Sequence, residues 1–108
     1  MTTINNIFKA LPDALTEEQF ETLAETSQLK IERIVSRGQP SPTTGWHDQS
    51  QNEWVMVVQG EATLNFIDQP SISLGTGDFI LIPAHQKHRV SYANPEKQTI
   101  WLAIHYPG

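Results

Sequence analysis

Residue types that bind metals occur at two places in this 108-residue chain. His47 and Gln49 stand two residues apart, so in an extended segment their side chains project to the same face. Glu53 follows a polar stretch that can turn the chain and bring its carboxylate beside them. His88 comes later, beyond the strand that Pro83 ends. On the inner wall of a single barrel, these side chains would face one another.

Two imidazoles and a carboxylate form a facial triad with open coordination positions. Such a triad suits non-haem Fe(II), with Mn, Ni or Zn as alternatives, and Gln49 would add a weak neutral oxygen ligand. We therefore expect a divalent metal ion bound by His47, Gln49, Glu53 and His88. Each position also has a structural alternative. His47 would then be an exposed loop residue, Glu53 the solvated end of a strand, and Gln49 a polar lining group.

The other two histidines, His85 and His105, are the candidate catalytic residues. His85 follows Pro83 and is expected at the mouth of a barrel, either as a general acid or base or as a solvated loop residue. His105 alternates with apolar residues in the last predicted strand. It would either line the cavity or be a hydrogen-bonded wall residue.

The first group of residues resembles a motif of the cupin superfamily, a class of small β-barrels. In that motif a His-x-His triplet precedes a glutamate and then, after six residues, a glycine. Here the triplet His47-Asp48-Gln49, Glu53 and Gly60 take those positions. The resemblance departs from the family at Gln49, where the family has a second histidine.

The second cupin motif is a glycine, five residues, Pro-x-Gly, two residues and a histidine. In this chain Gly77, the triplet Pro83-Ala84-His85 and His88 match it, with His85 in place of the glycine and Tyr92 in place of a terminal asparagine. Residues 45–92 carry the resemblance. It implies an all-β fold, a single double-stranded β-helix (jelly-roll) barrel, and a homodimer, because barrels of this family commonly pair.

The elements that must position these residues are short strands separated by turns. Apolar alternation and turn residues predict strands at 30–36, 53–58, 62–67, 71–74, 79–82, 90–93 and 99–106. Thr16-Glu17-Glu18-Gln19 fits a helix capping box, and Leu15, Phe20, Leu23 and Ala24 fit an apolar stripe. We therefore expect one domain, with residues 1–28 as a lead-in and short helix packed on a barrel formed by residues 29–108.

Composition excludes several other classes of protein. The absence of cysteine excludes disulfides, cysteine-type zinc sites and cysteine nucleophiles. A net charge of −5 with no visible basic patch argues against nucleic-acid binding. No apolar run is long enough to span a membrane, and no signal peptide is recognisable, so we expect a cytoplasmic protein.

Three functions remain open at this point. The first is a metal-dependent enzyme acting on a small molecule, such as a dioxygenase, isomerase or lyase. The second is a binding or sensing module that holds a small ligand in the same cavity without metal or turnover. The third is an interaction protein that uses the acidic N-terminal segment. The barrel fold alone does not decide among them.

Overall fold

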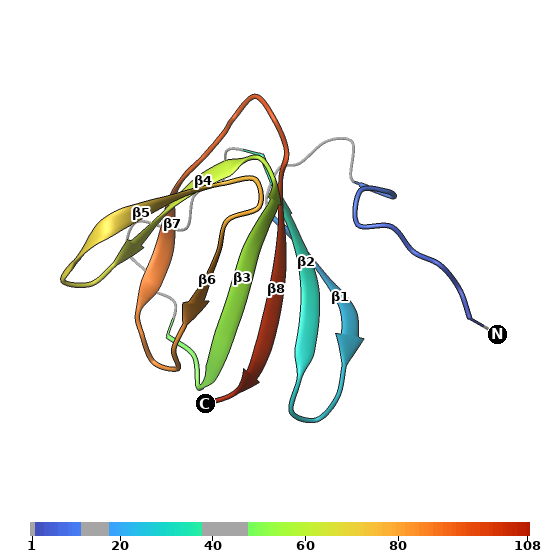
Figure 1. The fold of residues 1–108 in the computed structure, drawn as a ribbon, viewed down its shortest axis with the longest axis horizontal. Coiled ribbons are helices and arrows are strands. Elements are labelled where there is room, and N and C mark those ends of the chain that lie inside the picture. Colours follow the sequence, from blue (N-terminus) through green and yellow to red (C-terminus); the bar gives the residue numbers. More distant parts are fainter. Residues whose placement is uncertain (1, 12–17, 38–47) are drawn as a thin grey trace.

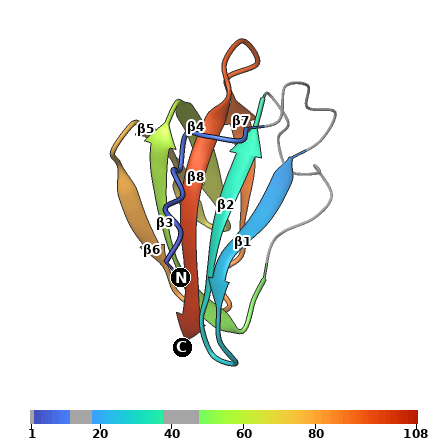
Figure 2. The same cartoon turned by 90° about the vertical axis from the view of Figure 1, so that its right-hand side faces the viewer.

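The computed structural model describes residues 2–11, 18–37 and 48–108, which form two antiparallel β-sheets (Figure 1). One sheet has five strands in the order β1-β2-β8-β3-β6, and the other has three in the order β5-β4-β7. Figure 2 looks onto the larger sheet, with β8, β2 and β1 side by side. The strands are β1 (Gln19–Glu25), β2 (Lys30–Ser36), β3 (Gln51–Gln59), β4 (Glu61–Phe66), β5 (Gln69–Gly75), β6 (Phe79–Ile82), β7 (His88–Ala93) and β8 (Thr99–Pro107).

All seven predicted strands are present, within a few residues of the expected bounds. Their alternation places one face of each sheet in a shared core. Val55 and Val57 of β3, Leu64 of β4 and Trp101 of β8 are all buried between the sheets. The all-β class is therefore confirmed. No helix among the described residues has the length and apolar character needed to cross a membrane.

The expected N-terminal helix is wrong where the structure describes this part of the chain. Residues 19–25 form the edge strand β1, paired antiparallel with β2 from Gln19 opposite Val35 to Glu25 opposite Lys30. The capping residues Thr16 and Glu17 lie outside the described residues. The open edge of β2 supplies backbone partners for this segment, and such non-local hydrogen bonds override a weak helical preference.

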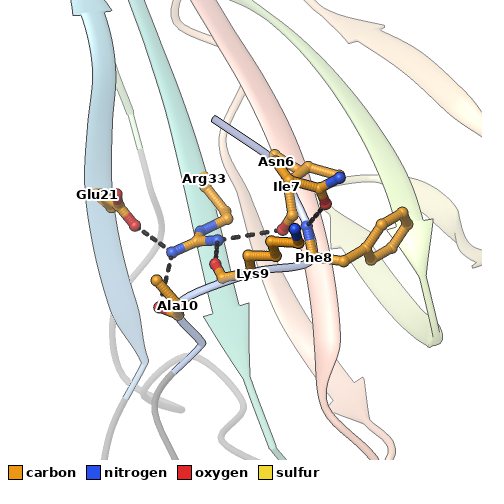
Figure 3. A network of polar contacts seen from close by, with 7 residues as sticks. All are labelled: Asn6, Ile7, Phe8, Lys9, Ala10, Glu21 and Arg33. Atoms are coloured by element: carbon orange, nitrogen blue, oxygen red, sulfur yellow. Dashed lines mark hydrogen bonds and ion pairs between the residues drawn. The ribbon is translucent and has the colours of Figure 1, made fainter. Parts of the chain in front are cut away.

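A buried arginine attaches the N-terminal segment to the outer face of β2 (Figure 3). Arg33 Nη1 donates to the carbonyls of Ile7 at 3.1 Å and Lys9 at 2.7 Å, and Nη2 donates to that of Ala10 at 3.2 Å. The guanidinium also forms an ion pair with Glu21 of β1. Beyond these contacts the N-terminal end extends away from the sheets (Figure 1).

Replacing Arg33 by methionine is expected to destabilise the fold by about 2 kcal/mol, because several charge-assisted hydrogen bonds are lost while their exposed partners regain water. The released segment should also become a protease substrate. Limited trypsin digestion should cleave after Lys9 faster than in the wild type. In the control Arg37→Met, whose guanidinium donates to the exposed carbonyl of Glu96, cleavage at Lys9 should be unchanged. Equal cleavage in Arg33→Met would show that Arg33 does not hold the segment.

Candidate functional site

A cavity of about 140 Å³ lies between the two sheets. Its described walls come from β1, β2, β8, β3 and β6 of the larger sheet on one side, and from β4 and β7 of the smaller sheet on the other. The lining residues are Glu18, Phe20, Glu32, Ile34, Gln49, Glu53, Val55, Leu64, Ile82, His88, Val90, Trp101 and His105. Four of the candidate metal-binding and catalytic residues therefore share one cavity: Gln49, Glu53, His88 and His105.

Glu53 and His88 form a buried pair at this cavity. Glu53 lies on β3, where it pairs with Ile82 of β6 and with His105 of β8. His88 begins β7 opposite Phe66 of β4, so the two residues belong to different sheets. Their side chains are only 11% and 8% exposed, and Glu53 Oε1 lies 3.4 Å from His88 Nε2. Glu53 thus faces the cavity and not the solvated end of its strand.

The other ring nitrogen of His88 decides what this pair can bind. Nδ1 lies 3.0 Å from the carbonyl oxygen of Gln86, an acceptor, so Nδ1 carries the proton. In a neutral ring Nε2 then presents a lone pair toward the carboxylate oxygen of Glu53. Two facing acceptors require a proton or a cation between them, and a backbone-anchored histidine of this kind is a common metal ligand. The donor chemistry of the pair fits a divalent ion.

Electrostatics favour the charged forms of both groups. Burial alone would raise the pKa of Glu53, but the hydrogen bond from His88, the charge of His105 and the hydrogen bond from Gln49 lower it below its usual value. Burial alone would lower the pKa of His88, yet the hydrogen bonds to Glu53 and to the Gln86 carbonyl, with the Glu53 charge, raise it. A divalent ion bound by these two groups would therefore compete with protonation of His88 Nε2.

Gln49 also faces the pair. Its Nε2 donates to Glu53 Oε1 at 2.8 Å, and its backbone carbonyl is held by the amide of His85 at 2.8 Å. Rotating the amide by half a turn would present its oxygen, the atom that binds metals. The fourth expected ligand, His47, lies outside the described residues. Within the described ranges, no three His, Asp or Glu side chains are grouped closely enough to hold a metal ion.

A second carboxylate–imidazole pair lines the same cavity. His105 Nε2 lies 2.9 Å from Glu32 Oε1, and Glu32 Oε2 lies 3.6 Å from Lys30 Nζ. His105 is thus both a cavity residue and a hydrogen-bonded wall residue. The sequence analysis did not select Glu32. Its alternation with Ile34, which places both on the inner face of β2, was the available signal. A further carboxylate, Glu18, also lines the cavity, and burial raises its pKa.

His85 is not brought to the cavity. Its side chain is 70% exposed, with Nδ1 2.9 Å from Asp48 Oδ1, and it is not a lining residue. Its backbone has φ 63°, the left-handed conformation that favours glycine, at the position where the cupin motif has glycine. His85 therefore takes over the backbone role of that glycine, and its amide fixes Gln49.

The fold and the cavity define a small jelly-roll barrel with a carboxylate–imidazole site. A family model described as Cupin domain matches residues 34–105. The chain belongs to the cupin superfamily, as the two motifs indicated. None of the curated protein sequences compared with the chain matches it.

Solved structures agree with this family. A protein of Ralstonia eutropha, described as a candidate mannose-6-phosphate isomerase, is 39% identical, with a TM-score of 0.95 over 99% of this chain and 100% of that one. An RmlC-like cupin with a double-stranded β-helix fold from Methanocaldococcus jannaschii is 22% identical, with a TM-score of 0.73 over 98% and 94% of the chains. An RmlC-like cupin from Desulfovibrio desulfuricans is 19% identical, with a TM-score of 0.78 over 99% and 98%. The last two establish the double-stranded β-helix fold alone.

Proposed function

We propose that this cupin binds a divalent metal ion at Glu53 and His88 and takes a small molecule into the same cavity. The observation that carries the proposal is the orientation of His88. Its Nδ1 is anchored on the Gln86 carbonyl, so its Nε2 faces the buried carboxylate of Glu53. Gln49, through its amide oxygen, and His47 complete the proposed ligand set. The identity of the metal stays open among Fe, Mn, Ni and Zn.

A bound metal would supply Lewis-acid polarisation of a ligand oxygen. The chain's own contribution to a reaction would come from His105. Its hydrogen bond to Glu32 holds the proton on Nε2, which leaves Nδ1 as the basic nitrogen of the ring. Such a group suits proton transfer in an isomerase, which is the activity named for the Ralstonia protein. We propose His105 for this role in preference to the exposed His85.

A metal-free ligand-binding protein is the second candidate function. Glu53 Oε1 receives a hydrogen bond from Gln49 and lies 3.4 Å from His88 Nε2. These contacts give the buried carboxylate polar partners from the chain itself, as a metal-free site would require. The two candidate functions differ in whether a metal ion binds between Glu53 and His88.

Substituting Gln49 by histidine tests the proposed metal site through a gain of affinity. Imidazole binds divalent ions more strongly than a neutral amide, so Gln49→His should tighten Zn²⁺ binding by about tenfold or more. Isothermal titration calorimetry on chelator-treated protein measures this, with one equivalent expected for the wild type.

The matched control is Gln51→His, because the Gln51 amide donates to the carbonyl of Gln28 outside the cavity. Its zinc affinity should equal that of the wild type. If Gln49→His also leaves the affinity unchanged, Gln49 does not face the metal. If no variant, nor the wild type, binds zinc, iron, manganese or nickel, the metal-free function is favoured.

Two further properties are proposed on the family resemblance and the sequence. We propose a homodimer, which sedimentation velocity on the tag-free protein would check. The cytoplasmic location expected from the sequence stays a prediction.

A further inference from the structure

All lysine and arginine side chains of the chain lie outside the cavity. The chain has seven Lys and Arg residues, and every one falls within the described ranges: Lys9, Lys30, Arg33, Arg37, Lys87, Arg89 and Lys97. None of the seven is a lining residue. The segments outside the described ranges contain neither lysine nor arginine, so they cannot add a permanent positive charge of this kind to the cavity wall.

The cavity wall instead carries three carboxylates. Glu53 and Glu32 are buried on the inner face of the larger sheet, and Glu18, which directly precedes β1, is half-buried. With the three carboxylates ionised and the two wall histidines neutral, a divalent ion at the proposed site would leave one negative charge uncompensated. Because buried charges are poorly screened, an anionic group entering the cavity would meet a repulsive field.

Lys30 is a cation in contact with a wall carboxylate. Its ammonium lies 3.6 Å from Glu32 Oε2, and its side chain is 40% exposed. The Glu32 carboxylate also accepts a hydrogen bond from His105. The positive charge of Lys30 is therefore partly compensated by Glu32. A phosphate group would have to take Lys30 away from Glu32 and would leave that carboxylate without its cation.

We infer that the cavity takes a small, uncharged, hydroxyl-bearing molecule of the monosaccharide or polyol class and excludes phosphate esters. Hydroxyl groups donate to the carboxylates and accept from imidazole and amide N–H groups, whereas a phosphate dianion can only accept. Trp101 and Phe20 add apolar surface for the C–H face of such a ligand. The inference rests on the proposed ligand-binding function of this cavity.

The size of the cavity agrees with such a ligand. At about 140 Å³ it is well below the roughly 300–1,000 Å³ of pockets that hold drug-sized molecules. The inferred ligand differs from the one in the description of the Ralstonia relative, which names an isomerase of a phosphorylated sugar. The two proteins would then share a fold and differ in the charge of the ligand they accept.

The test compares D-mannose with D-mannose 6-phosphate, which differ by the phosphate alone. Heteronuclear NMR of the ¹⁵N-labelled protein, with and without ZnCl₂, would follow the indole signal of Trp101, assigned with Trp101→Phe. The signal of Trp54 is the internal control, because that ring packs on Phe79 and does not line the cavity. D-mannose should shift Trp101, and mannose 6-phosphate should bind about tenfold more weakly.

Neutralising a wall carboxylate should reduce this preference. Glu32→Gln keeps a hydrogen-bonding partner for His105. We expect it to reduce the ratio of the two dissociation constants, mannose 6-phosphate over D-mannose, by about threefold; this ratio is the gap between the two sugars. Glu25→Gln removes an exposed carboxylate outside the cavity and should leave the gap unchanged. Equal or tighter binding of the phosphate ester would overturn the inference, with Lys30→Gln then showing whether Lys30 holds the phosphate.

The remaining outcomes also decide the matter. If neither sugar shifts Trp101, the cavity does not take ligands of this class. If Glu32→Gln leaves the gap unchanged, wall charge is not what excludes phosphate. If the protein binds D-mannose but no metal, the proposed metal site is refuted and the inference about the ligand stands. If the protein binds a metal and prefers the phosphate ester, the metal site stands and the inference about the ligand is refuted.

Discussion

Replacing His88 by alanine should weaken divalent-metal binding by about 100-fold or more while the barrel stays folded. The substitution removes the imidazole that faces Glu53 at 3.4 Å, and the carboxylate, the amide and the one imidazole that remain in the proposed set are a weaker ligand set. Because His88 lies at the first position of β7, the pairing of that strand with β4 does not depend on its side chain. Mass spectrometry of the tag-free protein would measure bound metal, and urea denaturation would confirm folding.

His85→Ala is the matched control for this experiment. It removes an imidazole from the same turn region, but His85 is exposed and its ring binds Asp48 outside the cavity. Its metal content should equal that of the wild type. Stoichiometric metal in His88→Ala would refute the assigned site, and loss of metal in both variants would point to the integrity of the turn before β7 and not to a ligand.

The strands could be predicted from the sequence because alternation reports directly on burial. The first strand could not, because its residues are exposed on both faces and its formation depends on the free edge of β2. One local signal was available. Thr26 Oγ1 accepts from the amides of Gln28 and Leu29, a side-chain turn that closes the β1–β2 hairpin. Read as a hairpin turn, Thr26 would have favoured a strand before it.

The candidate site was predicted in part for a related reason. Glu53 and His88 stand at motif positions, and their spacing was sufficient to place both at one cavity. The pair formed by Glu32 and His105 joins residues 73 positions apart, and nothing local to either residue indicates the other. Which strands become neighbours decides such a pairing, and β2 lies beside β8 only in the folded sheet.

The glycine positions of the cupin motifs have a conformational explanation. Gly60 and Gly77 have φ values of 104° and 90°, and His85, at the third motif glycine, has φ 63°. Part of the motif spacing therefore records backbone geometry, independently of any ligand. This explains how the chain can match the family closely in fold while Gln49 departs from the usual metal ligands.

Replacing Gly60 by alanine should destabilise the protein by about 4 kcal/mol, the sum of backbone strain and overpacking. A Cβ at this position would lie 2.7 Å from Oγ1 and 3.0 Å from Cα of Thr99, which is itself fully buried at the start of β8. Because that Cα is backbone, relief requires β8 to move away from the β3–β4 turn. Urea denaturation followed by tryptophan fluorescence would measure the loss.

Gly77→Ala separates the two contributions. Its φ is also positive, but a Cβ there would meet nothing within 4 Å, so strain alone should act and the loss should be about 1.5 kcal/mol. Equal losses in the two variants would show that contact with Thr99 contributes nothing. A larger loss for Gly60→Ala would mean that the turn after β3 fixes the position of β8. The same two strands carry Glu53 and His105 at paired positions, so the close approach at Gly60 also helps to hold the cavity's two carboxylate–imidazole pairs in register.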